Sequence, residues 1–172
     1  IFKKGDKLNM GKTEQNLMDA FAGESQANRK YLAFAKQAEQ EGFREVAKLF
    51  RAAAEAETVH AHAHLKVLGG IGKTAENLKT AIEGETHEFK KMYPVFIEEA
   101  EKEGNKAAER SFKFANEVEK IHAGLYQKAL DNLGKNKSVD YHVCSVCGMT
   151  VEGDAPDKCP VCGAAKKAFM KI

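Results

Sequence analysis

The sequence predicts a mainly helical protein, with a four-helix bundle made of two duplicated helical hairpins and a small cysteine-rich metal module. Three observations predict this fold class. Residues 1–93 contain no proline and are rich in helix-forming residues. Two stretches repeat each other at a distance of about 61 residues, and all four cysteines lie between positions 144 and 162. A chain of 172 residues has room for one domain with a small appendage.

The composition excludes several classes of protein. Lys and Arg number 27 and Asp and Glu 25, for a net charge of +2, which argues against a nucleic-acid-binding surface. We find no apolar run of the roughly 18 residues that a membrane span needs. Residues 1–12 (IFKKGDKLNMGK) also lack an apolar run. We therefore expect no leader peptide, no membrane partner and a cytoplasmic location.

An internal repeat organises the helical part. A shift of 61 residues aligns GKTEQNLMDAFAGES (11–25) with GKTAENLKTAIEGET (72–86), with eight of fifteen positions identical. At a shift of 62, AEQEGF (38–43) falls on AEKEGN (100–105) and AETVHAH (56–62) on VEKIHAG (118–124). The shift changes from 61 to 62 through one inserted residue, and the change falls between Ser25 and Tyr31 of the first half.

Each half predicts two helices joined at a Glu-Gly turn, which gives helices near 14–40, 43–68, 75–103 and 105–133. Thr13 and Thr74 are suited to N-caps. Pro94 should kink the third helix. Apolar residues at three- and four-residue steps are the expected bundle core. They include Leu17, Phe21, Leu32, Phe34, Val46, Leu49, Phe50, Leu65 and Leu68.

The repeat keeps a chemically selective set of side chains. Glu57-x-x-His60 matches Glu119-x-x-His122, and each pair lies one turn apart on one helix face. A single Glu of this kind is usually solvated, but matched positions across a duplication favour ligands. With Glu24 matching Glu85, the set is that of the di-iron or di-manganese site of ferritin-like bundles.

Glu88 breaks the symmetry, because the equivalent residue in the first half is Ala27. A fifth carboxylate beside one ion would make the two metal positions unequal, although a surface glutamate is the alternative. Five carboxylates facing one another need cations to offset their repulsion. Tyr31 and Tyr93 align in the repeat and either hydrogen-bond ligand carboxylates or fill core volume. The other histidines of the helices are expected to be solvated; they are His62, His64 and His87.

The cysteines form two knuckles, Cys144-x-x-Cys147-Gly and Cys159-Pro-x-Cys162-Gly, with eleven residues between them. This spacing predicts one tetrahedral four-thiolate site. The spacing does not separate structural zinc from redox-active iron, and a disulfide framework is the less favoured alternative.

In these motifs the chain resembles the rubrerythrin family over essentially its whole length. FAGES, EAETVHAH, EGETHEFKKMYP and EVEKIHAGLY resemble its ferritin-like di-iron domain, and CSVCG and CPVCG its rubredoxin-type domain. The resemblance implies domains at 1–136 and 141–172, with a linker at 137–140. It implies two iron ions in the bundle and one iron rather than zinc in the tail. Substitution of zinc in either site is the alternative that the sequence leaves open.

The resemblance also implies the ligands. The iron of the tail would be bound by Cys144, Cys147, Cys159 and Cys162. Glu88 and His60 would be the alternative ligands that one iron exchanges when its oxidation state changes. The full di-iron set would be Glu24, Glu57, His60, Glu85, Glu88, Glu119 and His122, with Tyr31 and Tyr93 beside the carboxylates.

The activity that the resemblance implies is reduction of hydrogen peroxide to water, as protection against oxidative stress. Electrons would pass from an external reductase or a rubredoxin through the tail iron to the di-iron site. Since the chain has no Gly-rich nucleotide fingerprint, NAD(P)H would act through that partner. The alternatives are an iron-oxidising storage protein, which needs no four-thiolate centre, and a structural bundle with a zinc-ribbon interaction module.

Geometry predicts a homodimer. If helices two and three run parallel, residues 69–76 can span at most about 28 Å. A 27-residue helix is about 40 Å long. Either helix two ends early, or a hairpin pairs with that of a neighbouring chain. We therefore expect a homodimer, with exchanged helices as one form of it and with the tail of one subunit serving the di-iron site of the other.

Overall fold

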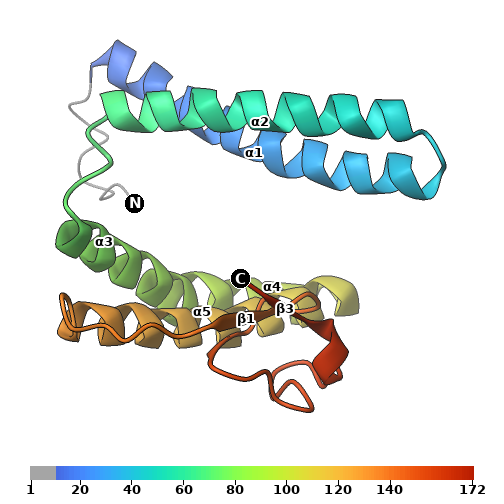
Figure 1. Cartoon of the computed structure of the whole chain (residues 1–172), viewed down its shortest axis with the longest axis vertical. Helices are drawn as coiled ribbons and strands as arrows, with labels where there is room; N and C mark the ends of the chain where they lie inside the picture. Colours follow the sequence, from blue (N-terminus) through green and yellow to red (C-terminus); the bar gives the residue numbers. More distant parts are fainter. Residues whose placement is uncertain (1–10) are drawn as a thin grey trace. The chain divides into compact units, whose positions relative to one another are not determined.

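The structure is a computed structural model that describes residues 11–172. These residues fall into two compact units, one ending at Gly72 and the other beginning at Lys73. Both units are mainly helical, and the second also carries a small sheet (Figure 1). The expectation of no leader peptide rests on residues that lie outside the described part.

The first unit is a hairpin of two antiparallel helices, α1 (Lys12–Gln40) and α2 (Arg44–Val67) (Figure 1). The contact between them is lined by alanine, whose small side chain lets the helices approach closely. Gly42 ends α1 with φ of 88°, and the N–H of Phe43 donates to the carbonyl of Ala38 at 2.8 Å. The buried alanines are Ala35, Ala38, Ala47, Ala54 and Ala61.

The core expected from the sequence is partly wrong in this unit. The side chains of Phe34, Val46 and Leu49 are 47%, 46% and 69% exposed. A two-helix hairpin has only one contact face, and the alanines occupy it, so these larger side chains lie on the open faces of the unit. The other expected core residues are half-buried: Leu17, Phe21, Leu32, Phe50, Leu65 and Leu68.

The helices of the second unit repeat this plan. α3 (Thr74–His87), η2 (Glu88–Met92) and α4 (Tyr93–Lys102) follow one another directly, and α5 (Lys106–Asp131) packs against all three. Gly104 has φ of 69°, and the N–H of Asn105 donates to the carbonyl of Ala100 at 2.9 Å, as in the turn after α1. The expected helix bounds are confirmed to within two residues at each end.

A triplet of aromatic rings confirms the duplication in three dimensions. Phe34 and Phe50 have ring centroids 5.6 Å apart, with Tyr31 beside both. In the second unit, Phe96 and Phe112 are also 5.6 Å apart, with Tyr93 beside both. Each ring lies 62 positions after its counterpart, so the internal repeat preserves side-chain packing as well as sequence.

The one-residue offset of the repeat has a structural explanation in η2, a π-helical turn. Tyr31 follows Ser25 by six positions, whereas Tyr93 follows Thr86 by seven. A π turn accommodates one extra residue within a helix, and such turns are frequent at functional sites. The N–H of Tyr93 donates to the carbonyl of Glu88 across this turn. The irregularity expected from Pro94 is therefore this π turn, after which α4 begins.

The predicted N-caps Thr13 and Thr74 are wrong by one or two positions. Both threonines lie inside their helices, whose caps are Gly11 and Lys73. The backbone N–H of Lys73 donates to the carboxylate of Glu76 at 2.7 Å. A glutamate at the third helical position thus serves the start of α3 without a threonine cap.

The cysteine module is a three-stranded antiparallel sheet in the order β2-β1-β3. Its strands are β1 (Tyr141–Cys144), β2 (Thr150–Glu152) and β3 (Phe169–Lys171), with the short helix η3 (Lys166–Ala168) before β3. Val118 of α5 is 2% exposed and shares one apolar cluster with Cys144, Met149 and Cys159. The module therefore packs directly on α5.

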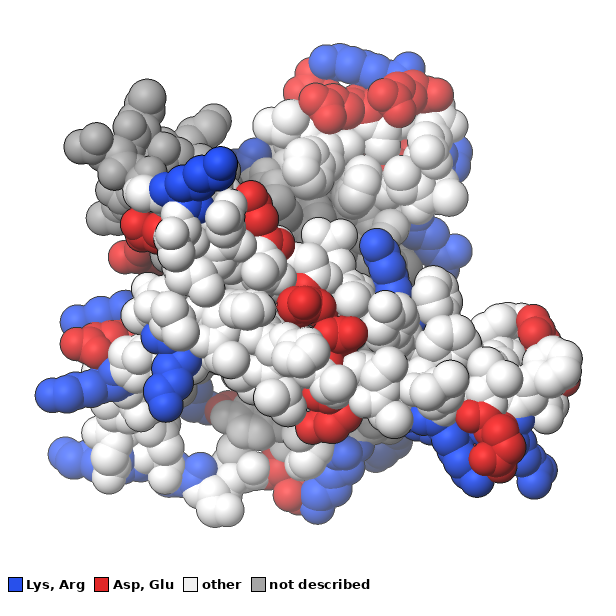
Figure 2. Space-filling model, turned by 90° about the horizontal axis from the view of Figure 1, so that it is seen from above, with Lys and Arg blue, Asp and Glu red and all other residues white. Residues whose placement is uncertain are grey.

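The surface agrees with the near-zero net charge. Figure 2 shows Lys and Arg interspersed with Asp and Glu on the visible face, without a large patch of one sign. Within residues 11–172, none of the helices is long and apolar enough to cross a bilayer.

Candidate metal centres

Two equivalent turns bring the four cysteines together. Cys144 ends β1, and the N–H of Gly148 donates to its carbonyl at 2.8 Å. In the second knuckle, the N–H of Gly163 donates to the carbonyl of Cys159 at 2.9 Å. Both glycines have positive φ, 83° and 78°, a conformation that favours glycine at these positions.

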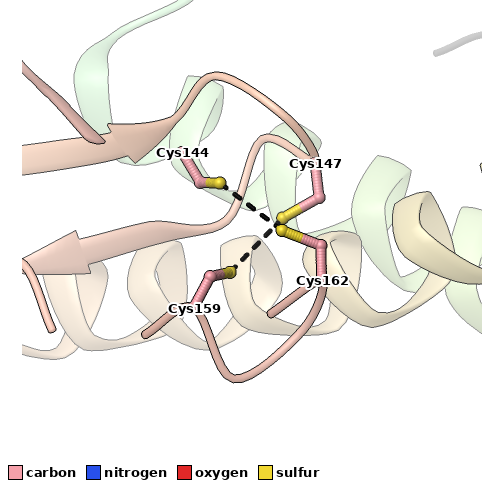
Figure 3. Close-up of side chains that lie close together, drawn as sticks. All are labelled: Cys144, Cys147, Cys159 and Cys162. Atoms are coloured by element: carbon pink, nitrogen blue, oxygen red, sulfur yellow. Dashed lines mark hydrogen bonds between the residues drawn. The ribbon is translucent and has the colours of Figure 1, made fainter. Parts of the chain in front are cut away.

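The four sulfur atoms converge on one point (Figure 3). The distance is 3.7 Å between Cys144 and Cys162 and 3.6 Å between Cys147 and Cys159. Sulfurs about 2.3 Å from one tetrahedral ion lie about 3.8 Å apart. A disulfide would need about 2.05 Å. The spacing therefore fits a metal ion, and all four cysteines are free.

The surroundings of the sulfurs also fit a bound cation. Burial raises the pKa of the Cys147 thiol, and hydrogen bonds to the neighbouring thiols add to this effect. Although burial opposes it, backbone N–H groups of Cys162 and Val161 lower the pKa of Cys159 to about 7. A cation that binds all four sulfurs favours the thiolate form at every one of them.

The first unit holds one carboxylate–histidine set. Ligand atoms of Glu24, Glu57 and His60 lie within 4.8 Å of one another. Glu24 comes from α1 and the other two from α2, where Nδ1 of His60 lies 2.9 Å from Oε2 of Glu57. The hairpin thus brings together the three residues that the repeat singles out in this half.

The second unit holds the matching set. Ligand atoms of Glu85, Glu119 and His122 also lie within 4.8 Å of one another. Nδ1 of His122 is 2.8 Å from Oε2 of Glu119 and 3.8 Å from Oε2 of Glu85. Ligand atoms about 2.1 Å from one octahedral ion, at right angles to each other, lie about 3 Å apart. The geometry fits a shared divalent ion, and nitrogen and oxygen donors suit iron.

Glu88 lies near this set without being one of its three members. It is half-buried at the start of η2, and its pKa is raised by burial and then by the charge of Glu119. The pKa of Glu85 is raised to about 7, first by burial and then by a hydrogen bond with Glu119. Crowding of three carboxylates is unfavourable without a cation, and a divalent ion relieves it.

The remaining sequence candidates behave differently. His62, His64 and His87 belong to none of the metal-ligating groups in residues 11–172. Neither Tyr31 nor Tyr93 donates its hydroxyl to a carboxylate in the described part of the chain; both pack in the aromatic triplets. Burial raises the pKa of Tyr93, and the charges of Glu88, Glu119 and Glu85 raise it further.

Two residues near the sets were missed by sequence reasoning. Asn28 is buried at the contact between α1 and α2, where its Nδ2 donates to Oγ1 of Thr58 at 2.8 Å. Thr150 of β2 has its hydroxyl 2.9 Å from Nε2 of His122. For Asn28 the available signal is a polar residue one turn after Glu24. For Thr150 no signal exists, because the docking of the module decides the contact.

Comparison with known proteins relates both the helical part and the cysteine module to one family. A family model described as Rubrerythrin matches residues 15–130, and one described as Rubrerythrin, rubredoxin-like domain matches residues 142–170. Rubrerythrin-2 of Clostridium acetobutylicum is 38% identical over 175 residues, which cover 92% of this chain and 95% of that protein. Nigerythrin of Nitratidesulfovibrio vulgaris is 34% identical, with 95% and 88% covered.

A solved structure of fully reduced, all-ferrous nigerythrin is similar to most of the chain. The TM-score is 0.56 at 34% identity, with 95% of this chain and 88% of that chain covered. The fold and sites define a helical metalloprotein that combines carboxylate–histidine sets with a four-thiolate module. The chain belongs to the rubrerythrin family. It is thus an oxidoreductase-type protein with the donor sets for a di-iron site and a four-cysteine iron site.

Proposed function

We propose that the protein reduces hydrogen peroxide to water. The peroxide takes up two electrons and two protons, its O–O bond breaks, and two water molecules form. The single observation that best supports this proposal is the contact between the two kinds of site. The cysteine module packs on α5 beside the Glu85, Glu119 and His122 set, where a source of electrons is needed.

The side chains have separate roles in this proposal. When bound, the iron pair supplies two electrons to the peroxide, and the cysteine-bound iron supplies electrons one at a time. The seven residues predicted from the sequence hold the pair: Glu24, Glu57, His60, Glu85, Glu88, Glu119 and His122. Burial and the nearby charges of Glu88 and Glu119 raise the pKa of Tyr93, so its phenol is a neutral group beside these carboxylates.

Glu88 and His60 are proposed as the alternative ligands of one iron position. The side chain of His60 is 56% exposed, whereas that of His122 is 26% exposed. Glu88 begins the π turn that has no counterpart in the first unit. Both residues therefore lie where the duplicated halves differ, which supports unequal roles for the two iron positions.

The electrons are proposed to come from a partner reductase or a rubredoxin that draws on NAD(P)H. The chain has no Gly-rich nucleotide motif of its own. Four free cysteines that serve as metal ligands are typical of a reducing compartment, which supports a cytoplasmic location.

Anaerobic stopped-flow spectroscopy tests the proposal. The iron-loaded protein is reduced, peroxide is added, and the thiolate-to-iron absorbance of the cysteine site is followed. We expect rapid reoxidation in the native chain and in Glu55→Ala, which changes an exposed residue of α2. In Glu57→Ala we expect a loss of at least about 100-fold in rate. Equally rapid reoxidation in Glu55→Ala and Glu57→Ala would show that the cysteine site reacts with peroxide alone, and would contradict the proposal.

Two outcomes would favour the other functions. Rapid oxidation and accumulation of Fe(II) by a protein that fails to reduce peroxide would favour iron storage. A colourless protein that holds only zinc at the cysteines when it is isolated from its native cells would favour a structural role. Metal analysis and the visible spectrum distinguish these two outcomes.

A further inference from the structure

Thr150 links the cysteine module to a predicted metal ligand of α5. Its hydroxyl oxygen lies 2.9 Å from Nε2 of His122 and 3.1 Å from the carbonyl oxygen of Gly148. Gly148 directly follows the ligand Cys147 in the chain. A short chain of hydrogen bonds therefore runs from the cysteine knuckle to the imidazole ring.

The direction of these hydrogen bonds follows from their chemistry. The hydroxyl of Thr150 donates its single proton to the carbonyl oxygen of Gly148, which can only accept. The hydroxyl oxygen is then the acceptor for Nε2–H of His122. With Nε2 protonated, Nδ1 is the nitrogen available for a metal ion, and Nδ1 is the atom that faces Glu119 and Glu85.

The hydroxyl is held in place by the packing of the module. Val118, one turn before His122, is 2% exposed and contacts the cluster that contains Met149, the residue before Thr150. At the other end of β2, Glu152 pairs with Lys128 of α5 and accepts from the hydroxyl of Tyr141 at 3.2 Å. Contacts on both sides of Thr150 therefore fix its distance from the ring.

The equivalent histidine of the first unit has no such partner. Nδ1 of His60 lies near Glu57, as Nδ1 of His122 lies near Glu119. Nε2 of His60 makes no hydrogen bond with any residue in 11–172, and its side chain is 56% exposed. The contact of Thr150 thus distinguishes two histidines that the sequence repeat makes equivalent.

We propose that Thr150 is a positioning residue that holds His122 in the tautomer and orientation needed for metal binding through Nδ1. This inference deepens the proposed function, since it rests on His122 as a metal ligand. Partners of this kind outside the ligand set change metal affinity by about 10- to 100-fold in other proteins. In this chain the partner comes from the cysteine module, so docking of the module also positions a ligand of the carboxylate–histidine set in the second unit.

Metal titration of three variants tests the role of the hydroxyl. Thr150→Val removes the hydroxyl at nearly constant shape, and Thr150→Ser retains it. Lys128→Met, the matched control, removes the ion pair between α5 and β2 but leaves the hydroxyl in place. The cysteine site is first filled with Zn²⁺, and the affinity of the carboxylate–histidine sets for Co²⁺ is then measured by visible absorption.

We expect Thr150→Val to lower the Co²⁺ affinity by about 10- to 100-fold, and Thr150→Ser and Lys128→Met to bind nearly as the native chain does. Native affinity in Thr150→Val would overturn the proposal. An equal loss in Thr150→Val and Lys128→Met would also overturn it, because docking alone would then explain the effect. The spectrum of the cysteine site with Co²⁺ in place of Zn²⁺ shows whether each variant keeps its module folded.

Nitrogen NMR of the zinc-loaded protein gives a readout that packing alone would not change. We expect a slowly exchanging Nε2–H on His122 in the native chain and in Thr150→Ser, and fast exchange in Thr150→Val. His60 should exchange fast in all three. Fast exchange at His122 in the native chain would contradict the proposal. Neither measurement uses peroxide, so a failure of the proposed peroxidase activity remains distinguishable from a failure of this inference.

Discussion

Asn28 lies one turn after Glu24 and is the buried polar residue at the contact between α1 and α2. Its Nδ2 donates to the carbonyl of Ala54 at 2.7 Å and to Oγ1 of Thr58 at 2.8 Å. Both partners lie within one turn of Glu57. The two hydrogen bonds therefore fix the register in which Glu24 meets Glu57.

Removing this side chain should destabilise the hairpin. We expect Asn28→Ala to lower the free energy of unfolding by about 2 kcal/mol, because two buried hydrogen bonds and the packing of the side chain are lost. Gln37→Ala, which removes an exposed hydrogen bond to Glu41 at the end of α1, should change it by less than about 0.5 kcal/mol. Urea unfolding of the metal-free protein measures both values. Equal effects would contradict the role given to Asn28.

Glu85 gives the metal-free protein a pH dependence. Its pKa is raised from 4.5 to about 7, mainly by burial, so the folded protein binds more protons than the unfolded chain between these values. The free energy of unfolding should therefore fall as the pH rises through this window. Glu85→Gln should reduce the slope, and saturating Zn²⁺, which keeps the carboxylate deprotonated in the folded protein, should remove the contribution of Glu85. Urea titrations between about pH 4.5 and pH 7.5 test this, and a metal-free protein that gains stability across the window would contradict it.

At the scale of elements, the π turn and Pro94 occur together. The first half has Leu32 in place of Pro94 and lacks the extra residue. Proline inside an α-helix loses a hydrogen bond and clashes with the carbonyl four residues earlier, at a cost of about 3 kcal/mol. The wider turn of η2 ends two residues before Pro94 and contains Lys90, the residue whose carbonyl the proline would meet in a regular α-helix.

Deletion of Lys90, an exposed residue of η2, should restore a regular helix. We expect the deletion to cost about 3 kcal/mol in the native background and clearly less together with Pro94→Ala. Deletion of the exposed Glu83 in α3, within a regular turn, is the control and should be costly in both backgrounds. Unfolding monitored by circular dichroism gives the coupling between the two changes. If the costs of the Lys90 deletion and of Pro94→Ala simply add, the π turn does not depend on the proline, and the prediction is wrong.

At the scale of the whole molecule, the duplicated halves carry matching ligand sets but unequal surroundings. Only the second unit has the π turn, the fifth carboxylate and the docked cysteine module in the described part of the chain. We propose that the two sets share one pair of ions.

α2 runs to Val67, so the alternative that helix two ends early is wrong. Residues 68–73 span at most about 20 Å, and α2 is about 36 Å long.

These lengths support the proposed homodimer, in which one hairpin pairs with that of a neighbouring chain. We expect a mass in solution of twice the 18.9 kDa of the chain. Leu49, 69% exposed on α2, should lie in the interface, so Leu49→Glu should weaken the dimer. Lys66→Glu, on an exposed position of the same helix, should not. Light scattering after size exclusion measures all three, and a monomeric native chain at micromolar concentration would contradict the proposal.

The helices, the cysteine knuckles and the two carboxylate–histidine sets could all be predicted from the order of the residues. Helical periodicity, Glu-Gly turns and ligand spacing are local properties that a sequence shows directly. The duplication also showed that Glu57 is equivalent to Glu119 and His60 to His122. The one-residue change in the shift of the repeat marked where η2 lies, but it did not show that the extra residue forms a π turn.

Which apolar residues are buried, and which polar groups meet across elements, depends on how the elements pack in three dimensions. Leu49 is exposed because alanines take the contact face of the hairpin, and no periodic pattern distinguishes the two faces. Thr150 reaches His122 from 28 positions further along the chain. Such a contact depends on how a separately folded module packs on a helix, and therefore on side-chain shapes far apart in the sequence.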